Sequence, residues 1–143
     1  MKPYSMDPII PHLWVGAQPP EGHAVGKRFK VLVLAAKEIQ GGSKYRGIQV
    51  IKVPLDDSGP PPTRNEVFAA HLAGIEVAKH VIGHQNVLST CHMGLNRSAL
   101  VAVLALRNLG WTANDAIGRI RMARGSQALS NSYFVEVIQG YGA

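Results

Sequence analysis

The chain has 143 residues, which fits one compact domain, and no linker or shift of composition divides it. Its hydrophobic fraction of 46% suits a packed core, while its longest uninterrupted apolar run, Ala99 to Leu106, is far too short to cross a membrane. The formal net charge of +6 favours anionic partners, but no aromatic residues alternate with the basic ones as on a nucleic-acid surface. We therefore predict one globular domain over residues 1–143 with no membrane partner.

The chain contains one cysteine and no secretory signal pattern. A single cysteine cannot form an internal disulfide. Residues 1–14 lack a positively charged start followed by a sustained apolar stretch and a small-residue cleavage site. Both features favour a cytoplasmic location.

Four segments have the composition of strands. Residues 9–16 form the first and residues 30–36 the second, whose nearly continuous apolar run predicts burial on both faces. Residues 19–29 between them have room only for a short helix and turns. The other two strands are expected at 47–55, which is β-branched and alternating, and at 86–91, which ends at Cys91.

Capping signals mark the start of the first long helix. Thr63 and Glu66 have the spacing of a capping box, in which each side chain satisfies a main-chain N–H group of the other. The helix is expected to continue to about Gly83. Its core face is assigned to the periodic apolar residues Phe68, Leu72, Ile75 and Ile82.

Three further helices complete the predicted fold. Residues 97–108 are apolar nearly all round, as in a central buried helix, and Gly110 can end it. Strands interspersed with helices predict an α/β domain with a mixed sheet of four to five strands that is flanked by helices and covered on both faces. The last two helices are expected to start at a cap formed by Thr112 and Asp115 and run to Met122, and to start at Ser130 or Asn131 and run to Ile138.

The strongest chemical signal is the stretch from Cys91 to Ser98. A thiol between a strand and the start of a helix lies where main-chain N–H groups and the positive end of the helix converge, which favours both a thiolate and a bound phosphate. Gly94 lets the loop curl around a phosphoryl group. Arg97, the sixth residue after Cys91, can offer a planar fork to two phosphate oxygens.

This stretch resembles the signature of the C-x5-R phosphatases, and in particular that of the small dual-specificity protein phosphatases. The segments HLWVG at 12–16 and SNSYF at 130–134 are also similar to family segments, so the resemblance covers most of the chain. It implies a protein tyrosine phosphatase-like fold and hydrolysis of phosphotyrosine or phosphoserine/threonine through a phosphocysteine, without a metal or other cofactor. The implied phosphate-binding loop consists of His92, Met93, Gly94, Leu95, Asn96 and Arg97.

The resemblance also implies a general acid on a loop upstream of the thiol. Asp57 in the segment VPLDDSGPPP matches this position best, and its neighbour Asp56 points in a different direction at the strand end. Ser98 corresponds to the family's hydroxyl after the arginine, which helps the thiolate leave, although the same residue type could cap the helix. Arg121 and Arg124 lie where relatives carry basic residues, so they are candidates for a second contact with the substrate or for a solvated helix face.

Two departures keep other functions open. Most relatives have histidine before the cysteine, whereas this chain has Thr90, so a phosphate-binding module with little hydrolysis is one alternative unless the Thr90 hydroxyl substitutes. Asn96 before Arg97 is similar to the loop of RNA 5′-triphosphatases, so an RNA 5′ end is a second possible substrate, although Asp57 favours a phosphoprotein.

Phosphoinositide phosphatases usually carry basic residues in the loop, and this loop has none before Arg97. His80 and His84 have helical spacing but no further ligands to complete a zinc site.

Overall fold

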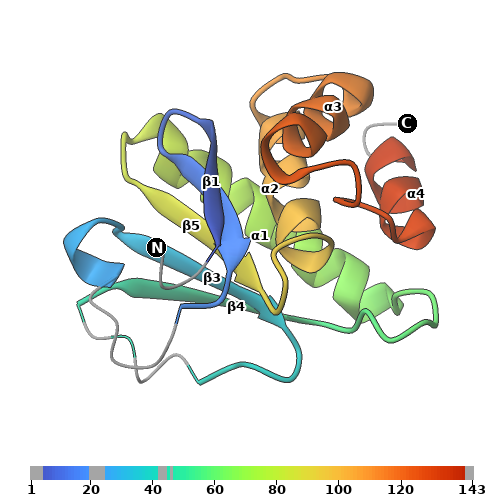
Figure 1. The fold of residues 1–143 in the computed structure, drawn as a ribbon, viewed down its shortest axis with the longest axis horizontal. Coiled ribbons are helices and arrows are strands. Elements are labelled where there is room, and N and C mark those ends of the chain that lie inside the picture. Colours follow the sequence, from blue (N-terminus) through green and yellow to red (C-terminus); the bar gives the residue numbers. More distant parts are fainter. Residues whose placement is uncertain (1–4, 20–24, 42–44, 46, 141–143) are drawn as a thin grey trace.

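The computed structural model describes residues 5–19, 25–41, 45 and 47–140, and these residues build a five-stranded sheet (Figure 1). The strands lie in the order β1-β2-β5-β3-β4. β1 is antiparallel to β2, and the other neighbouring pairs are parallel, so the predicted mixed sheet is confirmed. The strands are β1 (Met6–Ile10), β2 (Leu13–Ala17), β3 (Val31–Ala36), β4 (Gln49–Leu55) and β5 (Val87–Cys91).

The single strand predicted over residues 9–16 is in fact two strands. A tight turn at Pro11 and His12 separates β1 from β2, and His12 has a φ of 74°. Proline cannot donate to a sheet ladder and is therefore confined to edges and strand ends, and β1, which contains Pro8, is an edge strand. The apolar pattern continues across the turn, which is why it suggested one strand.

The predicted helices are all present. They are α1 (Arg64–Ile82), α2 (Arg97–Asn108), α3 (Ala113–Arg124) and α4 (Ser132–Gly140). The capping box of α1 is formed, with Thr63 Oγ1 accepting from Glu66 N at 3.1 Å and Glu66 Oε1 accepting from Thr63 N at 3.0 Å. The short helix expected between β2 and β3 is a 3-10 turn, η1 (Val25–Lys27), and residues 20–24 of that segment lie outside the described ones.

The core face of α1 differs from the prediction. The assigned residues Phe68, Leu72, Ile75 and Ile82 are 65%, 50%, 38% and 67% exposed. The opposite face packs on α2 so closely that a Cβ atom at Gly74 would lie 2.7 Å from the Cβ of Leu104. Only small side chains and valines fit there, so the larger apolar residues point outward. The buried residues of α1 are Ala70, Ala73, Gly74, Val77, Ala78 and Val81.

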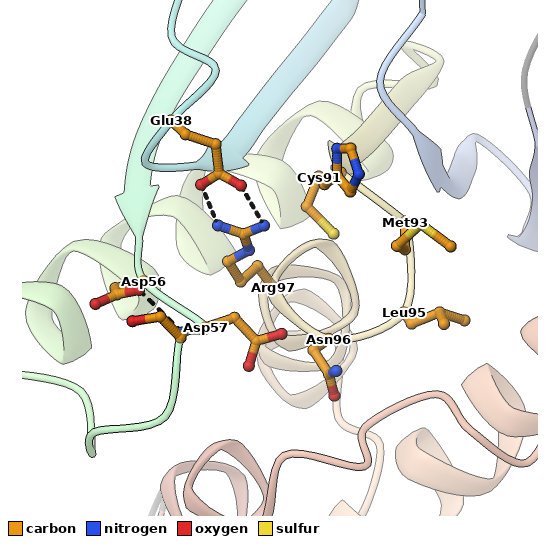
Figure 2. A pocket seen from close by; sticks show the side chains of 10 residues that line it. Glu38, Asp56, Asp57, Cys91, Met93, Leu95, Asn96 and Arg97 are labelled. Carbon is orange, nitrogen blue, oxygen red and sulfur yellow. Dashed lines mark hydrogen bonds and ion pairs between the residues drawn. The ribbon is translucent and has the colours of Figure 1, made fainter.

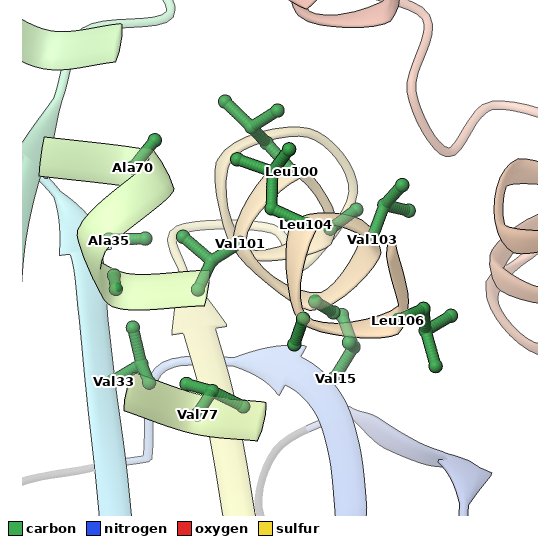
Figure 3. Packing of buried hydrophobic residues seen from close by; sticks show 14 of the residues in the cluster. Val15, Val33, Ala35, Ala70, Val77, Leu100, Val101, Val103, Leu104 and Leu106 are labelled. Carbon is green, nitrogen blue, oxygen red and sulfur yellow. The ribbon is translucent and has the colours of Figure 1, made fainter. Parts of the chain in front are cut away.

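The two faces of the sheet are covered differently. On β3, Val31, Val33 and Ala35 belong to the main core with the helices, whereas Leu32 and Leu34 belong to a smaller cluster with residues of η1 and its flank. Figure 3 shows Val33, Ala35 and Val15 facing the side chains of α2. The sheet is thus covered on both faces, as expected, and all four α-helices contribute to the main core. The smaller cluster contains Val25, Phe29, Leu32, Leu34, Tyr45 and Leu88.

The helix α2 runs through the middle of the main core. Every residue from Arg97 to Leu106 is buried, as the apolar sequence predicts. Because α2 follows directly on the loop after β5, burial of the helix fixes where that loop lies. No helix in the described part of the chain is long and apolar enough to cross a membrane.

Candidate active site

A cavity of about 390 Å³ opens at the carboxyl ends of the parallel strands (Figure 2). Segments after β3, β4 and β5 all contribute to it, because the ends of parallel strands meet at one edge of a sheet. Its side chains therefore come from three distant parts of the chain. The lining residues are Glu38, Asp56, Asp57, Ser58, Cys91, His92, Met93, Leu95, Asn96 and Arg97.

The loop between β5 and α2 is tightly curled at Gly94. This residue has a φ of 72°, and a Cβ atom on it would lie 2.5 Å from the carbonyl carbon of Gly16 and 2.6 Å from Nη2 of Arg124. Glycine is therefore needed both for the backbone conformation and for the close approach to β2. The loop places Cys91, His92, Met93, Leu95 and Asn96 on the cavity wall, whereas Gly94 faces the protein behind it.

Cys91 lies at the end of β5 and is only 2% exposed. Its Sγ atom is 3.1 Å from Oγ of Ser98, which is fully buried. The residue in the N-cap position of α2 is Asn96, whose side chain makes no capping hydrogen bond. Ser98 is therefore not the residue that caps the helix. Its hydroxyl group faces the Cys91 sulfur atom, where it can donate to a thiolate.

Arg97 is held by a residue that the sequence analysis missed. Glu38 Oε1 accepts from Arg97 Nη1 at 2.5 Å, and Oε2 accepts from Nη2 at 2.8 Å, in a two-pronged ion pair. This hydrogen bonding lowers the pKa of Glu38 to about 2 and raises the pKa of Arg97. Nη1 also donates to the carbonyl of Leu55 at 3.1 Å. Glu38 follows the carboxyl end of buried β3, and this position at the active-site edge is the signal that could have pointed to it.

The Nε atom of this arginine has no partner within the described protein. The Arg97 side chain is 9% exposed, and its Nε atom is buried with no hydrogen-bond partner among the residues that the structure describes. Buried donors are nearly always satisfied in folded proteins, so an unsatisfied one beside a cavity calls for an explanation. An anionic oxygen bound beside Arg97 would supply the missing acceptor.

The two neighbouring aspartates are used differently. Asp57 Oδ1 accepts from Asn131 Nδ2 at 2.6 Å. Asp56 Oδ1 accepts from the main-chain N–H of Ser58 at 3.0 Å, and hydrogen bonds from the Ser58 side chain and main chain lower the pKa of Asp56. Asp56 is therefore engaged in a turn, whereas Asp57 is bonded to the segment before α4.

Thr90 does not direct its hydroxyl toward the thiol. It is fully buried in β5, and Oγ1 donates to the carbonyl of Val33 on β3 at 2.6 Å. Its single proton is therefore used within the sheet. The threonine hydroxyl therefore does not donate to the thiol.

The two arginines of α3 bind main-chain carbonyl groups. Arg124 donates to Gly94 O at 3.0 Å and to Met93 O at 3.1 Å, and it pairs with Asp7 at 2.9 Å. Arg121 donates to the carbonyls of Ala128 and Leu129. Neither residue lines the cavity. In this structure both side chains hold loops through these bonds.

The histidines considered for zinc also have local partners. His80 Nδ1 lies 2.5 Å from Oε1 of Gln85, and the ring of His84 stacks on that of His12 with centroids 5.2 Å apart. No group of three or more histidine, cysteine, aspartate or glutamate side chains in the described residues could hold a metal ion.

The fold of the described residues is similar to that of solved small dual-specificity and protein tyrosine phosphatases. Among solved structures, Tk-PTP in its active form superimposes with a TM-score of 0.78 at 22% identity, over 94% of both chains. Human DUSP28 gives 0.77 at 20% identity, over 97% of this chain and 92% of that one. PTPMT1 in complex with PI(5)P gives 0.76 at 18% identity, over 94% and 92%. No protein-family model matches the chain, and neither does any curated protein.

Proposed function

We propose that this chain is a metal-independent phosphatase that removes phosphate from phosphorylated proteins or peptides through a phosphocysteine intermediate. The observation that carries the proposal is the shared cavity, in which the Cys91 sulfur, the Arg97 guanidinium and the Asp57 carboxyl group meet (Figure 2). These three groups supply a nucleophile, a phosphate-binding cation and a proton donor. The fold shared with solved phosphatases supports the same conclusion.

In the first step, the Cys91 thiolate attacks phosphorus and the bond between phosphorus and the substrate oxygen breaks. Asp57 gives its proton to that oxygen, so the leaving group departs as a neutral alcohol or phenol. The planar fork of Arg97 stabilises the charge on the transferred oxygens, and its unpaired Nε is a donor for one of them.

In the second step, a water molecule attacks the phosphocysteine. Asp57, now ionised, accepts a proton from that water, and the bond between sulfur and phosphorus breaks to release inorganic phosphate. The leaving sulfur carries negative charge, and Ser98 Oγ at 3.1 Å can donate a hydrogen bond to it. Both steps balance without a metal ion or another cofactor.

The cavity favours a substrate with one phosphate. Three carboxylate side chains, those of Glu38, Asp56 and Asp57, line it, and Arg97 is the only lysine or arginine among the described residues that line it. A phosphoinositide with several phosphates or a triphosphate RNA end would bring additional negative charge against them. Asn96 precedes Arg97 as an asparagine does in the loop of RNA 5′-triphosphatases. Its side chain here contacts Ser130 and Asn131.

The test compares the wild type with Cys91→Ser on four substrates: phosphotyrosine and phosphoserine peptides, a phosphoinositide and RNA with a 5′-triphosphate. We expect turnover of a phosphopeptide, complete loss in Cys91→Ser, and a loss of about 10² or more in Asp57→Asn. Turnover of RNA or lipid alone would contradict the proposed substrate. Binding of phosphopeptide without turnover by the wild type would show a phosphate-binding module instead.

We further place this activity in the cytoplasm. The proposed mechanism needs a reduced sulfur, because oxidation of a cysteine thiolate removes the nucleophile. The reducing conditions of that compartment would keep Cys91 in the required state.

A further inference from the structure

Asn131, directly before α4, contacts the acid loop and the phosphate-binding loop at once. Its Nδ2 atom donates to Oδ1 of Asp57 at 2.6 Å, and its main-chain N–H donates to Oδ1 of Asn96 at 3.0 Å. Its own Oδ1 accepts from the main-chain N–H of Tyr133 at 3.0 Å, as in a helix cap. Both polar atoms of its side chain therefore have a defined partner.

We propose that Asn131 is a positioning residue that fixes the orientation of the general acid and determines which oxygen of Asp57 carries the transferable proton. The inference rests on the proposed phosphatase function, since it assigns a role within that reaction. It differs from the roles of Cys91, Arg97 and Asp57 because Asn131 itself contacts neither the sulfur nor the reacting phosphate.

The orientation of the Asn131 amide group follows from its partners. A main-chain N–H can only donate, so the atom that faces Tyr133 must be the amide oxygen. The NH₂ group then necessarily faces Asp57. A reversed amide would leave the N–H of Tyr133 pointing at another donor.

This orientation differentiates the two oxygens of Asp57. Oδ1 accepts a short hydrogen bond from Asn131, so a proton on that oxygen would compete with the amide N–H. In the acid form of Asp57 the proton therefore resides on Oδ2. Asn131 thus keeps one oxygen occupied as an acceptor and leaves the other to donate to the leaving group.

The segment that carries Asn131 is itself held against the phosphate-binding loop. The N–H of Leu129 donates to the carbonyl of Leu95 at 2.8 Å, and Arg121 donates to the carbonyl of Leu129 at 3.1 Å. Because the same segment contacts Leu95, Asn96 and Asp57, the distance between the acid and the phosphate site is set through one short piece of chain. Rigid support of this kind is what a proton transfer needs, since small misplacements cost large factors in rate.

The decisive variant is Asn131→Asp, compared with Asn131→Ala. Aspartate keeps the acceptor that caps α4 and nearly the same volume, but its carboxylate cannot donate to Asp57. The substrates are phenyl phosphate, whose leaving group needs protonation, and p-nitrophenyl phosphate, whose leaving group needs it less. We expect both variants to lose about 10- to 100-fold in kcat on phenyl phosphate and less than about threefold on p-nitrophenyl phosphate.

A double-mutant cycle and a matched control separate positioning from stability. In an Asp57→Asn background, the Asn131 substitutions should change kcat on phenyl phosphate by no more than about twofold, because their effect passes through Asp57. Thr112→Ala removes a similar helix cap from α3, where Thr112 Oγ1 accepts from Asp115 N at 3.1 Å, away from the cavity. It should lower thermal stability as Asn131→Ala does, without any dependence on the leaving group.

Each outcome decides the proposal. Equal losses on both substrates, or losses that persist in the Asp57→Asn background, would show that Asn131 only supports the fold and would overturn the inference while leaving the phosphatase function intact. A wild-type chain that turns over neither substrate would overturn the proposed function and this inference with it.

Discussion

The carboxylate of Glu38 holds the guanidinium of Arg97 at both terminal nitrogens, with hydrogen bonds of 2.5 and 2.8 Å between residues 59 positions apart. Glu38 follows β3 and Arg97 begins α2, so the parallel sheet is what brings them together. An arginine held along one edge keeps its plane fixed, while its Nε remains without a partner among the described residues. The orientation that the proposed phosphate binding needs is therefore established before any substrate arrives.

Replacing Glu38 should reduce activity without removing the phosphate-binding charge. In Glu38→Gln the amide can accept only one of the two hydrogen bonds, so Arg97 loses its fixed orientation. We expect kcat/KM on a phosphotyrosine peptide to fall by about 10-fold or more. Glu136→Gln, an exposed change on α4, is the control and should be neutral. A Glu38→Gln variant within twofold of the wild type would show that Leu55 alone orients the arginine.

The same ion pair predicts a pH dependence of stability. The hydrogen bonds from Arg97 lower the pKa of Glu38 from 4.5 to about 2. Between these values the unfolded chain binds the proton and the folded chain does not, so stability falls as pH falls. The contribution is fully present above about pH 4.5 and is lost as the pH approaches 2.

Urea unfolding of the wild type and Glu38→Gln at a series of pH values measures this contribution. The difference between their unfolding free energies should shrink steadily below about pH 4.5, in the direction set by the lowered pKa. A difference that stays constant to the lowest pH would mean that the ion pair does not stabilise the folded state.

Gly94 and Gly110 form a matched pair for the phosphate-binding loop. Both have positive φ, 72° and 100°, but a Cβ atom on Gly94 would meet the backbone of β2 at 2.5 Å whereas one on Gly110 would meet nothing within 4 Å. Gly110→Ala should cost about 1–2 kcal/mol from backbone strain alone and leave kcat unchanged. Gly94→Ala should cost more and reduce kcat by about 10² because the loop must shift. Equal effects of the two changes on kcat, measured with one phosphopeptide, would contradict this view of the loop.

Gly74 and Gly118 test the packing of α1 on α2 in a similar way. A Cβ atom on Gly74 would lie 2.7 Å from Leu104 Cβ and 3.1 Å from its carbonyl carbon, whereas Gly118 on α3 has open space around it. Gly74→Ala should therefore destabilise the chain by about 1–3 kcal/mol through overpacking. Gly118→Ala should stabilise it by about 0.5–1 kcal/mol, since alanine favours a helix. Chemical denaturation of both variants gives the comparison, and a stabilising Gly74→Ala would show that the helices can separate without cost.

Sequence signals between neighbouring residues predicted where helices and strands lie better than they predicted which of their faces pack together. The capping box at Thr63 and Glu66 located the start of α1 because its hydrogen bonds join residues three positions apart. The face of α1 was assigned wrongly because apolar periodicity shows that a face exists, whereas the close approach of Leu104 to Gly74 decides which face is buried. The turn at Pro11 and His12 was missed for a related reason, since apolar residues continue on both sides of it.

The same distinction between local and long-range signals applies to the residues of the candidate site. Cys91, Arg97 and Asp57 stand in a recognisable sequence pattern, and the structure places them around one cavity. Glu38 belongs to no local pattern, because its partner is 59 residues away and only the sheet order brings the two together. For the basic residues of α3, the sequence shows a positive charge but not whether main-chain carbonyls already bind it, as they do at Arg124.

Cys91 is the chain's only cysteine and is 2% exposed at the wall of the cavity. A thiol-directed reagent such as iodoacetamide can therefore add one label per molecule at most, and it must enter the cavity to do so. The fraction of molecules that carry the added mass in an intact-protein mass spectrum would measure the fraction whose cavity is open. Inorganic phosphate that slows the labelling would report occupancy of the cavity directly, even in variants that no longer turn over any substrate.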